Sequence, residues 1–377
     1  MDKNFDDLRP YRDNEISAAV HRIAENPLFD KVMQFLYPGG NLAVLKEKFL
    51  QINTIVDFQY QVMHYAINLI AKKTMTSFSY SGLEELDRSK RYLFISNHRD
   101  IVLDSALLQV ALHDTGHRTS EITFGSNLMQ GQFVIDIGKS NKMFKVERGG
   151  TPREFYRNSL ILSHYIRHTL IDKMESIWIA QRNGRSKDGN DLTDQGIIKM
   201  FSMSSDKNIA ENLAELNITP MAVSYQWEVC DVEKVNEIYI SRREKYIKKP
   251  GEDLQSIING FLQFKGKVHI TVTQPLTIEE LNERAALEKN DVTAGIASLI
   301  NERIFKAYNL SSTNYIAYDI LGNNESHIEK HYTRSEKDFF ISEMDRKLSA
   351  LNGDLSELKD IYLGIYANPV VNYLKSI

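Results

Sequence analysis

Hydrophobic positions in the N-terminal part of the chain recur every three or four residues, which is the spacing of one face of an α-helix. Residues 16–36 follow this pattern until Pro38-Gly39 interrupts it, and a second run extends over residues 45–70. We therefore predict a helical hairpin over residues 1–77. Its apolar stripe either packs on the rest of the protein, as most amphipathic helices do, or lies in a membrane interface or over an acyl chain.

Beyond residue 77 the pattern changes to short apolar runs that alternate with helical stretches. Six runs are predicted to be strands: residues 92–96, 121–125, 144–147, 177–180, 218–225 and 267–273. Such alternation is typical of an α/β unit, in which helices flank a central mixed, largely parallel sheet. We assign this unit to residues 78–276 and predict a helical extension over residues 277–377. The predicted fold class is thus α/β with helical additions at both ends.

The composition narrows the class of protein. The 377 residues are 42% hydrophobic, which is enough for a large core, and the net charge of −4 argues against a nucleic-acid-binding protein. No window approaches about 20 uninterrupted apolar residues, the length of a transmembrane helix, and the first residues lack the apolar segment of a signal peptide. The single cysteine, Cys230, indicates a reducing compartment. We therefore expect a cytoplasmic protein that rests on the inner face of a membrane.

Candidate chemistry gathers in the polar turn after the predicted strand over residues 92–96. The turn carries His98, and a new apolar run follows it. A strand that delivers a histidine to its carboxyl end, with an acid close behind, is a common layout for general-base catalysis. Two acids, Asp100 and Asp104, lie close enough in the sequence to be the partner of His98.

Four short blocks connect the chain with a known family. Residues 96–104 read S-N-H-R-D-I-V-L-D, which resembles the N-H-x-x-x-x-D signature of the glycerolipid acyltransferases, the family of glycerol-3-phosphate and lysophosphatidate acyltransferases. Three more blocks follow in the family's order: F-K-V-E-R at residues 144–148, I-A-Q-R-N-G-R-S at residues 179–186 and I-T-P-M-A-V-S-Y at residues 218–225. The resemblance implies the glycerol-3-phosphate acyltransferase fold for this part of the chain.

The sequence departs from the family pattern at two points. Five residues rather than four separate His98 from Asp104, and a one-residue bulge in the turn would restore their contact. We favour Asp104 over Asp100 because it precedes a small residue and an apolar helix, as the family's aspartate does. In the third block, Gln181 or Arg182 stands where the family has a glutamate. That acid is thought to bind the acceptor, so the identity of the acceptor stays open.

The resemblance implies a direct acyl transfer. His98, neutral near pH 7, would take the proton of an acceptor hydroxyl while the hydroxyl oxygen attacks an acyl thioester, and the aspartate would hold the imidazole tautomer. Arg148 and Arg185 would clamp a phosphate, unless both form ordinary surface or structural ion pairs. The other residues expected to line the substrate site are Arg99, Arg182, Gly184 and Ser186.

The function expected from the resemblance belongs to membrane phospholipid synthesis. A fatty acyl group would move from acyl-carrier protein or coenzyme A (acyl-CoA) to a hydroxyl of glycerol-3-phosphate or a lysophospholipid. The acyl thioester is a co-substrate, and no cofactor is expected. Two alternatives stay open: an O-acyltransferase for a lyso-aminolipid, and a non-catalytic family member that binds lipid without turnover.

Two further features concern partners and metals. A basic cluster is either a solvated helix face or a docking site for anionic lipid headgroups or an acidic acyl-carrier protein. Its members are Arg242, Arg243, Lys245, Lys248 and Lys249. Three histidine pairs are spaced for one helix face, but none belongs to an H-E-x-x-H motif and no third ligand is evident. These pairs are His164 with His168, His113 with His117, and His327 with His331. We therefore expect no metal site.

Overall fold

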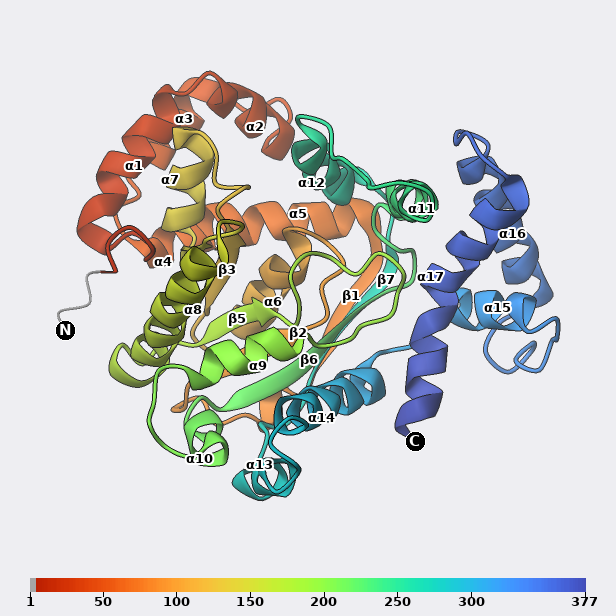
Figure 1. The fold of residues 1–377 in the computed structure, drawn as a ribbon. Coiled ribbons are helices and arrows are strands. Elements are labelled where there is room, and N and C mark those ends of the chain that lie inside the picture. The colour runs from red at the N-terminus through yellow and green to blue at the C-terminus, as the bar shows by residue number, and fades with distance from the viewer. Residues whose placement is uncertain (1–4) are drawn as a thin grey trace.

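The computed structural model describes residues 5–377. Seven strands form one sheet in the order β1-β7-β6-β2-β5-β3-β4 (Figure 1). They are β1 (Met75–Ser81), β2 (Leu93–Ser96), β3 (Glu121–Gly125), β4 (Met143–Val146), β5 (Ile177–Ala180), β6 (Ile218–Tyr225) and β7 (Gly266–Val272). All neighbours pair in parallel except β6 and β7, which are antiparallel. The sheet is mixed and largely parallel, so the predicted fold class is confirmed.

The central strand β2 shows why a strand in the middle of the sheet is legible in the sequence. Successive side chains of a strand point to opposite faces of the sheet. Leu93 and Ile95 of β2 join the hydrophobic core on one face, and Phe94 joins the core on the other. A strand that is buried on both faces is a continuous apolar run. The missed strand, β1, lies at the edge of the sheet, and its T-S-F-S-Y-S sequence alternates polar and aromatic side chains that stay largely accessible.

Helices cover both faces of the sheet (Figure 1). On one face lie α5 (Tyr65–Thr74), the short 3₁₀-helix η2 (Leu83–Glu85), α6 (Leu103–Asp114) and α12 (Glu252–Leu262). On the other face lie α8 (Pro152–Arg167), continued by the π-helical η3 (His168–Asp172), α9 (Gln195–Ser202), α10 (Ile209–Ala214), α13 (Ile278–Ala285) and α14 (Val292–Ala307). Helix α6 is buried from Leu103 to Leu112, which places it inside the core rather than on its surface.

The N-terminal helices build a core of their own against α7 (Gln132–Ser140). They are α1 (Asp13–Glu25), α2 (Leu28–Leu36), α3 (Leu42–Leu50), α4 (Ile55–Phe58) and the π-helical segment η1 (Gln59–His64), which runs into α5. The helix predicted over residues 45–70 is interrupted, because Thr54 caps α4 by accepting a hydrogen bond from the N–H of Asp57 at 3.0 Å. Most of the apolar stripe is packed, whereas Leu28, Val32 and Phe35 of α2 stay exposed.

The C-terminal helices belong to two different cores. Helices α13 and α14 lie on the sheet, whereas α15 (Ser312–Leu321), α16 (Arg334–Leu348) and α17 (Leu355–Ser376) pack together with α11 (Asp231–Ser241). The sequence-based domain boundaries at residues 77 and 276 stay predictions. Within residues 5–377, no helix combines the length and the apolar character needed to cross a membrane.

The candidate site lies where parallel strands end together. Strands β6, β2, β5, β3 and β4 run in one direction, so their carboxyl ends share one edge of the sheet. After β2 the chain forms β3, β4 and β5, which lie on one side of β2 in the sheet, and then β6, which pairs with β2 on its other side. The end of β2 is therefore a topological switch point. Ligands bind at such points in open α/β sheets.

Candidate active site

His98 and Asp104 form a buried pair just beyond the end of β2. The Nδ1 atom of His98 lies 2.9 Å from Oδ2 of Asp104. The same oxygen accepts hydrogen bonds from the backbone N–H groups of Arg99 at 2.6 Å and Asp100 at 2.9 Å. A carboxylate accepts and does not donate, so Nδ1 carries the ring proton and Nε2 is left with a lone pair. The imidazole is thereby held in the tautomer that a general base requires.

The turn between His98 and Asp104 accommodates the extra residue of the motif. Its backbone wraps around the Asp104 carboxylate, which collects two of the turn's own N–H groups besides the imidazole. The other carboxylate oxygen accepts a hydrogen bond from the hydroxyl of Tyr225, on β6, at 2.8 Å. Burial, together with the nearby Asp104 and Asp100, raises the pKa of Tyr225 well above its ordinary value. The tyrosine therefore stays protonated and donates to Asp104.

Asp100, the other candidate partner of His98, has a different place. Its Oδ1 atom accepts the backbone N–H groups of Val102 at 2.8 Å and Leu103 at 2.7 Å, which caps the start of α6. Its Oδ2 atom is buried without a hydrogen-bond partner among residues 5–377 and lies against Gly260 of α12, where an added Cβ would approach it to 2.2 Å. Burial and the neighbouring Asp104 raise the pKa of the Asp100 carboxyl.

Trp178 of β5 forms a wall beside the histidine. Its ring meets the imidazole of His98 edge-on, with centroids 5.7 Å apart, and its Nε1–H donates to Ser96 at 3.0 Å. Sequence reasoning missed both Trp178 and Tyr225, because each sits in an apolar strand where the spacing of hydrophobic residues carries no sign of a functional contact.

Arg99, which the sequence suggested as a pocket residue, is instead part of a buried ion-pair network. Its guanidinium is fully buried and contacts Asp191 at 2.6 Å and Glu228 at 3.0 Å. Lys234 also pairs with Glu228 and donates to the backbone carbonyl of Arg99 at 3.0 Å. The charges of two cations, Arg99 and Lys234, thus balance those of two carboxylates beneath the turn. The network anchors the His98 turn to the segment after β6 and to the loop after β5.

Removal of one cation from this network is expected to destabilise the fold. In Arg99→Met, Glu228 keeps Lys234 as its partner, whereas Asp191 loses the cation with which it pairs. Breaking a buried ion pair in this way costs about 3–5 kcal/mol. The free energy of unfolding in urea measures the loss. Arg153→Met, at an exposed position on α8, is the matched control and should stay within about 0.5 kcal/mol of the wild type. Equal stabilities of the two variants would contradict the structural role.

The loop after β5 is docked on the His98 turn. The N–H of Gln181 donates to the carbonyl of Ser96 at 2.8 Å, and the N–H of Ser186 donates to the carbonyl of His98 at 2.7 Å. Gly184 sits between these anchors with a φ of +78°, a conformation that favours glycine. The third sequence block is therefore held against the candidate catalytic turn from both of its ends.

Arg185 is a buried cation of this loop, and it forms no ion pair with any residue from 5 to 377. Its residue is 9% exposed, and its Nη1 atom has no hydrogen-bond partner within the part of the chain that the structure describes. The described residues place no carboxylate within ion-pair distance of it, although its charge acts on Asp100 and Asp253. A buried guanidinium with a free donor is costly unless a ligand supplies the acceptor. Ser186 beside it also has a buried hydroxyl without a partner among residues 5–377.

Arg148 follows β4 at the same edge of the sheet. Its guanidinium lies over Gly125, where an added Cβ would approach Nε to 2.6 Å. The residue as a whole is exposed, but partial desolvation of the guanidinium lowers the pKa of Arg148, and Asp253 of α12 opposes the shift. Asp253 thus interacts with both Arg148 and Arg185. The carboxyl edge of the sheet therefore carries the guanidinium groups of Arg148 and Arg185. Of the other candidates in the third block, Arg182 is partly exposed and Gln181 is fully buried.

The comparison with protein-family models agrees with the sequence motifs. Residues 77–224 match the family model described as Acyltransferase. The crystal structure of the 1-acyl-sn-glycerophosphate (LPA) acyltransferase PlsC from Thermotoga maritima is similar to this chain at 11% sequence identity, with a TM-score of 0.35. That match covers 77% of this chain and 91% of the other. No curated protein matches the chain.

Proposed function

Given that residues 77–224 belong to the Acyltransferase family, we propose that this acyltransferase moves a fatty acyl group from an acyl thioester to a hydroxyl of glycerol-3-phosphate or a lysophospholipid. The observation that carries the proposal is the His98–Asp104 contact of 2.9 Å, which leaves Nε2 of His98 free to accept a proton. The donor is acyl-CoA or acyl-carrier protein, since either presents the same thioester.

The pair supports a direct mechanism with no enzyme nucleophile. The acceptor hydroxyl donates its proton to Nε2 of His98 while its oxygen forms a bond to the thioester carbonyl carbon. The carbon–sulfur bond then breaks, and the imidazolium returns the proton to the departing thiolate, which leaves as a thiol. Asp104 stabilises the imidazolium meanwhile, and Tyr225 holds the second oxygen of Asp104 in place.

Arg185 and Arg148 support a phosphate-bearing acceptor. A guanidinium offers a fixed fork of donors that matches phosphate oxygens. Arg185 lies in the loop that docks on the His98 turn, and its Nη1 donor has no hydrogen-bond partner among residues 5–377. Arg148 lies at the same edge of the sheet. A phosphate that bridges both arginines would satisfy this donor and bring the acceptor hydroxyl to the histidine.

A lyso-aminolipid is the second candidate acceptor. The family's glutamate is replaced here by Gln181 or Arg182, so neither position offers a carboxylate to a hydroxyl-rich acceptor. Gln181 is fully buried and its Nε2 atom has no hydrogen-bond partner among residues 5–377. An amide or carbonyl oxygen of an acylated amino acid would be a fitting acceptor for that donor.

Acyl transfer by the purified protein tests the proposal. Acyl-CoA and acyl-carrier protein serve as donors, and the acceptor panel holds glycerol-3-phosphate, lysophosphatidate and a lyso-aminolipid. Ester products identified by mass spectrometry with a phosphate acceptor support the proposal. Exclusive use of the lyso-aminolipid favours the second candidate, and the absence of any product favours a non-catalytic lipid-binding protein.

A membrane contact is proposed for the region around α12. Leu254, Ile258 and Leu262 form a stripe on this helix and are 60%, 40% and 58% exposed. The opposite side of α12 packs on the sheet core. Ile247, in the loop before α12, is 78% exposed, and Lys245 and Lys249 flank it as exposed cations. Apolar side chains bordered by lysines suit an interface with anionic lipid headgroups.

The structure divides the basic cluster that the sequence suggested. Arg242 and Arg243 both pair with Glu357 of α17, and Lys248 pairs with Asp253 at 2.5 Å. Their charge is partly balanced within the protein. Lys245 and Lys249 therefore carry the proposed attraction to anionic lipid.

Charge reversal at these two lysines is expected to weaken vesicle binding. Each lysine near an anionic surface contributes about 1 kcal/mol, so Lys245→Glu with Lys249→Glu should reduce affinity for phosphatidylserine-containing vesicles at least tenfold. Sedimentation with the vesicles measures the bound fraction. The charge-matched control is Lys289→Glu with Lys306→Glu, both at exposed positions outside this region. Equal binding by the two double variants would reject α12 and its loop as the contact.

A further inference from the structure

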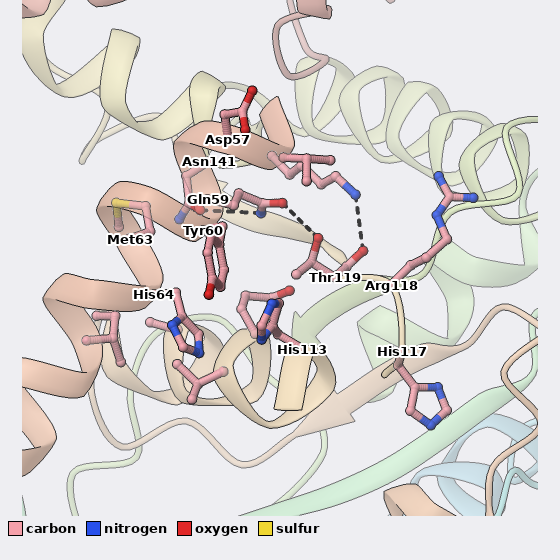
Figure 2. A pocket seen from close by; sticks show the side chains of 16 residues that line it. Asp57, Gln59, Tyr60, Met63, His64, His113, His117, Arg118, Thr119 and Asn141 are labelled. Carbon is pink, nitrogen blue, oxygen red and sulfur yellow. Dashed lines mark hydrogen bonds between the residues drawn. The ribbon is translucent and has the colours of Figure 1, made fainter. Parts of the chain in front are cut away.

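A cavity of about 300 Å³ lies between the N-terminal helices and α6, away from the candidate active site. Its walls come from α4, η1 and α5 on one side and from α6 on the other (Figure 2). His64 and His113 line it and lie close to each other beneath the ring of Tyr60. Asp114, the last residue of α6, stands beside both histidines.

The three side chains converge on a single point. Nε2 of His64 lies 3.1 Å from Oδ1 of Asp114, and Nδ1 of His113 lies 3.3 Å from the same oxygen. One donor atom from each residue falls within 4.8 Å of the other two. Around a tetrahedral ion with bonds of 2.0–2.1 Å, neighbouring ligand atoms stand about 3.3 Å apart. The two separations that involve Asp114, 3.1 Å and 3.3 Å, are close to the edges of such a tetrahedron.

We propose that His64, His113 and Asp114 bind a divalent transition-metal ion, with Zn²⁺ as the best fit. Two imidazoles and one carboxylate form the ligand set of many zinc sites with three protein ligands. The fourth position stays open to a water molecule or a small ligand from the cavity. Ca²⁺ and Mg²⁺ fit poorly, because they require six or more oxygen ligands or keep several waters.

The surroundings hold the two imidazoles in place. The ring of Tyr60 stacks on His64 at 5.6 Å and on His113 at 5.0 Å between centroids. His64 is the last residue of η1, and π-helical turns of this kind occur frequently at functional sites. The amide nitrogen of Asn68 donates to the backbone carbonyl of His64 at 2.9 Å and lies 3.2 Å from both ring nitrogens, so this side chain packs against the imidazole.

The local charge also favours a cation. His113 and Asp114 lie in the last turn of α6, where the helix dipole places its negative end. Two cations, Arg118 and Lys142, line the same cavity, but both pair with Glu175. The side chains of His64 and His113 are 24% and 44% exposed, which gives an ion a path from solvent.

The proposed site is separate from the catalytic pair. Asp104 and Asp114 are ten residues apart on α6, and a rise of 1.5 Å per residue separates them by about 15 Å. His117, which the sequence paired with His113, turns away and approaches the carbonyl of Leu83 at 2.9 Å instead (Figure 2). The remaining ligand, His64, lies 50 positions before Asp114 in the sequence, so the local sequence around His113 did not reveal it.

Titration of chelator-treated, full-length protein with ZnCl₂ tests the proposal. Isothermal titration calorimetry should show one ion per chain, and Co²⁺ should produce the visible absorption bands of a tetrahedral site. Because the ion would link η1 to α6, a hundredfold excess over Kd should raise Tm by at least about 3 °C. None of these readouts depends on acyl transfer, so the inference stands or falls separately from the proposed function.

Variants identify the ligands. His64→Ala and His113→Ala should each weaken Zn²⁺ binding more than tenfold, and Asp114→Asn provides a second test if either alanine variant folds poorly. His117 lines the same cavity but is not a proposed ligand, so His117→Ala should bind Zn²⁺ as tightly as the wild type. Absence of stoichiometric Zn²⁺ binding, or undiminished binding by the His64 and His113 variants, would overturn the proposal.

Discussion

His98→Ala is expected to lower the rate of acyl transfer about 10²–10⁴-fold, the usual contribution of a positioned general base. The imidazole is the group whose Nε2 lone pair is available at the end of β2, because its Nδ1 proton is held by Asp104 at 2.9 Å. Initial rates of thiol release, measured with the preferred acceptor and both proteins at equal concentration, give the ratio directly.

The control for this variant is another histidine with a similar structural setting. His117→Ala removes a partly buried imidazole that contacts a backbone carbonyl and should leave the rate unchanged. Circular dichroism and Tm establish that both variants are folded. A His98→Ala protein that is folded and transfers acyl groups at the wild-type rate would exclude general-base catalysis by this histidine.

Arg185→Met is expected to reduce kcat/KM for a phosphate-bearing acceptor about 10–100-fold without lowering stability. Hydrogen bonds to charged groups are worth about 1.5–3 kcal/mol, and a phosphate would supply the acceptor that the Nη1 atom lacks among residues 5–377. Removal of a buried cation without an ion pair should not cost folding free energy, in contrast to the loss expected for Arg99→Met. Steady-state kinetics and urea unfolding on the same preparation measure the two effects.

A neutral acceptor separates phosphate binding from general damage to the site. With monoacylglycerol, which has the hydroxyl but no phosphate, kcat/KM should be the same for the wild type and Arg185→Met. An equal loss for both acceptors, or a fall in unfolding free energy comparable to that of Arg99→Met, would show that Arg185 is structural.

Six strands were predictable from short apolar runs, and these runs are clearest in β2, β5 and β6, which are buried on both faces. β1 was not, since an edge strand of alternating polar and aromatic residues carries no such run. The break between α3 and α4 was missed for a different reason. The hydrophobic spacing continues across residues 51–54, and only the capping contact of Thr54 with Asp57 shows where the chain turns.

The motif placed His98 and Asp104 correctly in contact, because residues that flank a strand-to-helix turn are close in any fold that keeps the turn. It misplaced Arg99, whose partners Asp191 and Glu228 lie 92 and 129 positions further along the chain. Sequence adjacency does not tell which way a side chain points out of a turn. The same limit hid Tyr225, which reaches Asp104 across 121 positions.

A double-mutant cycle on acyl transfer tests the central claim, that His98 and Asp104 act as one catalytic unit. Asp104→Asn alters the partner that sets the imidazole tautomer, and His98→Ala removes the imidazole itself. If they act as a unit, the double variant is no slower than His98→Ala alone, because Asp104 has no imidazole left to orient. Losses that multiply in the double variant would show that the two residues contribute independently and would contradict the account.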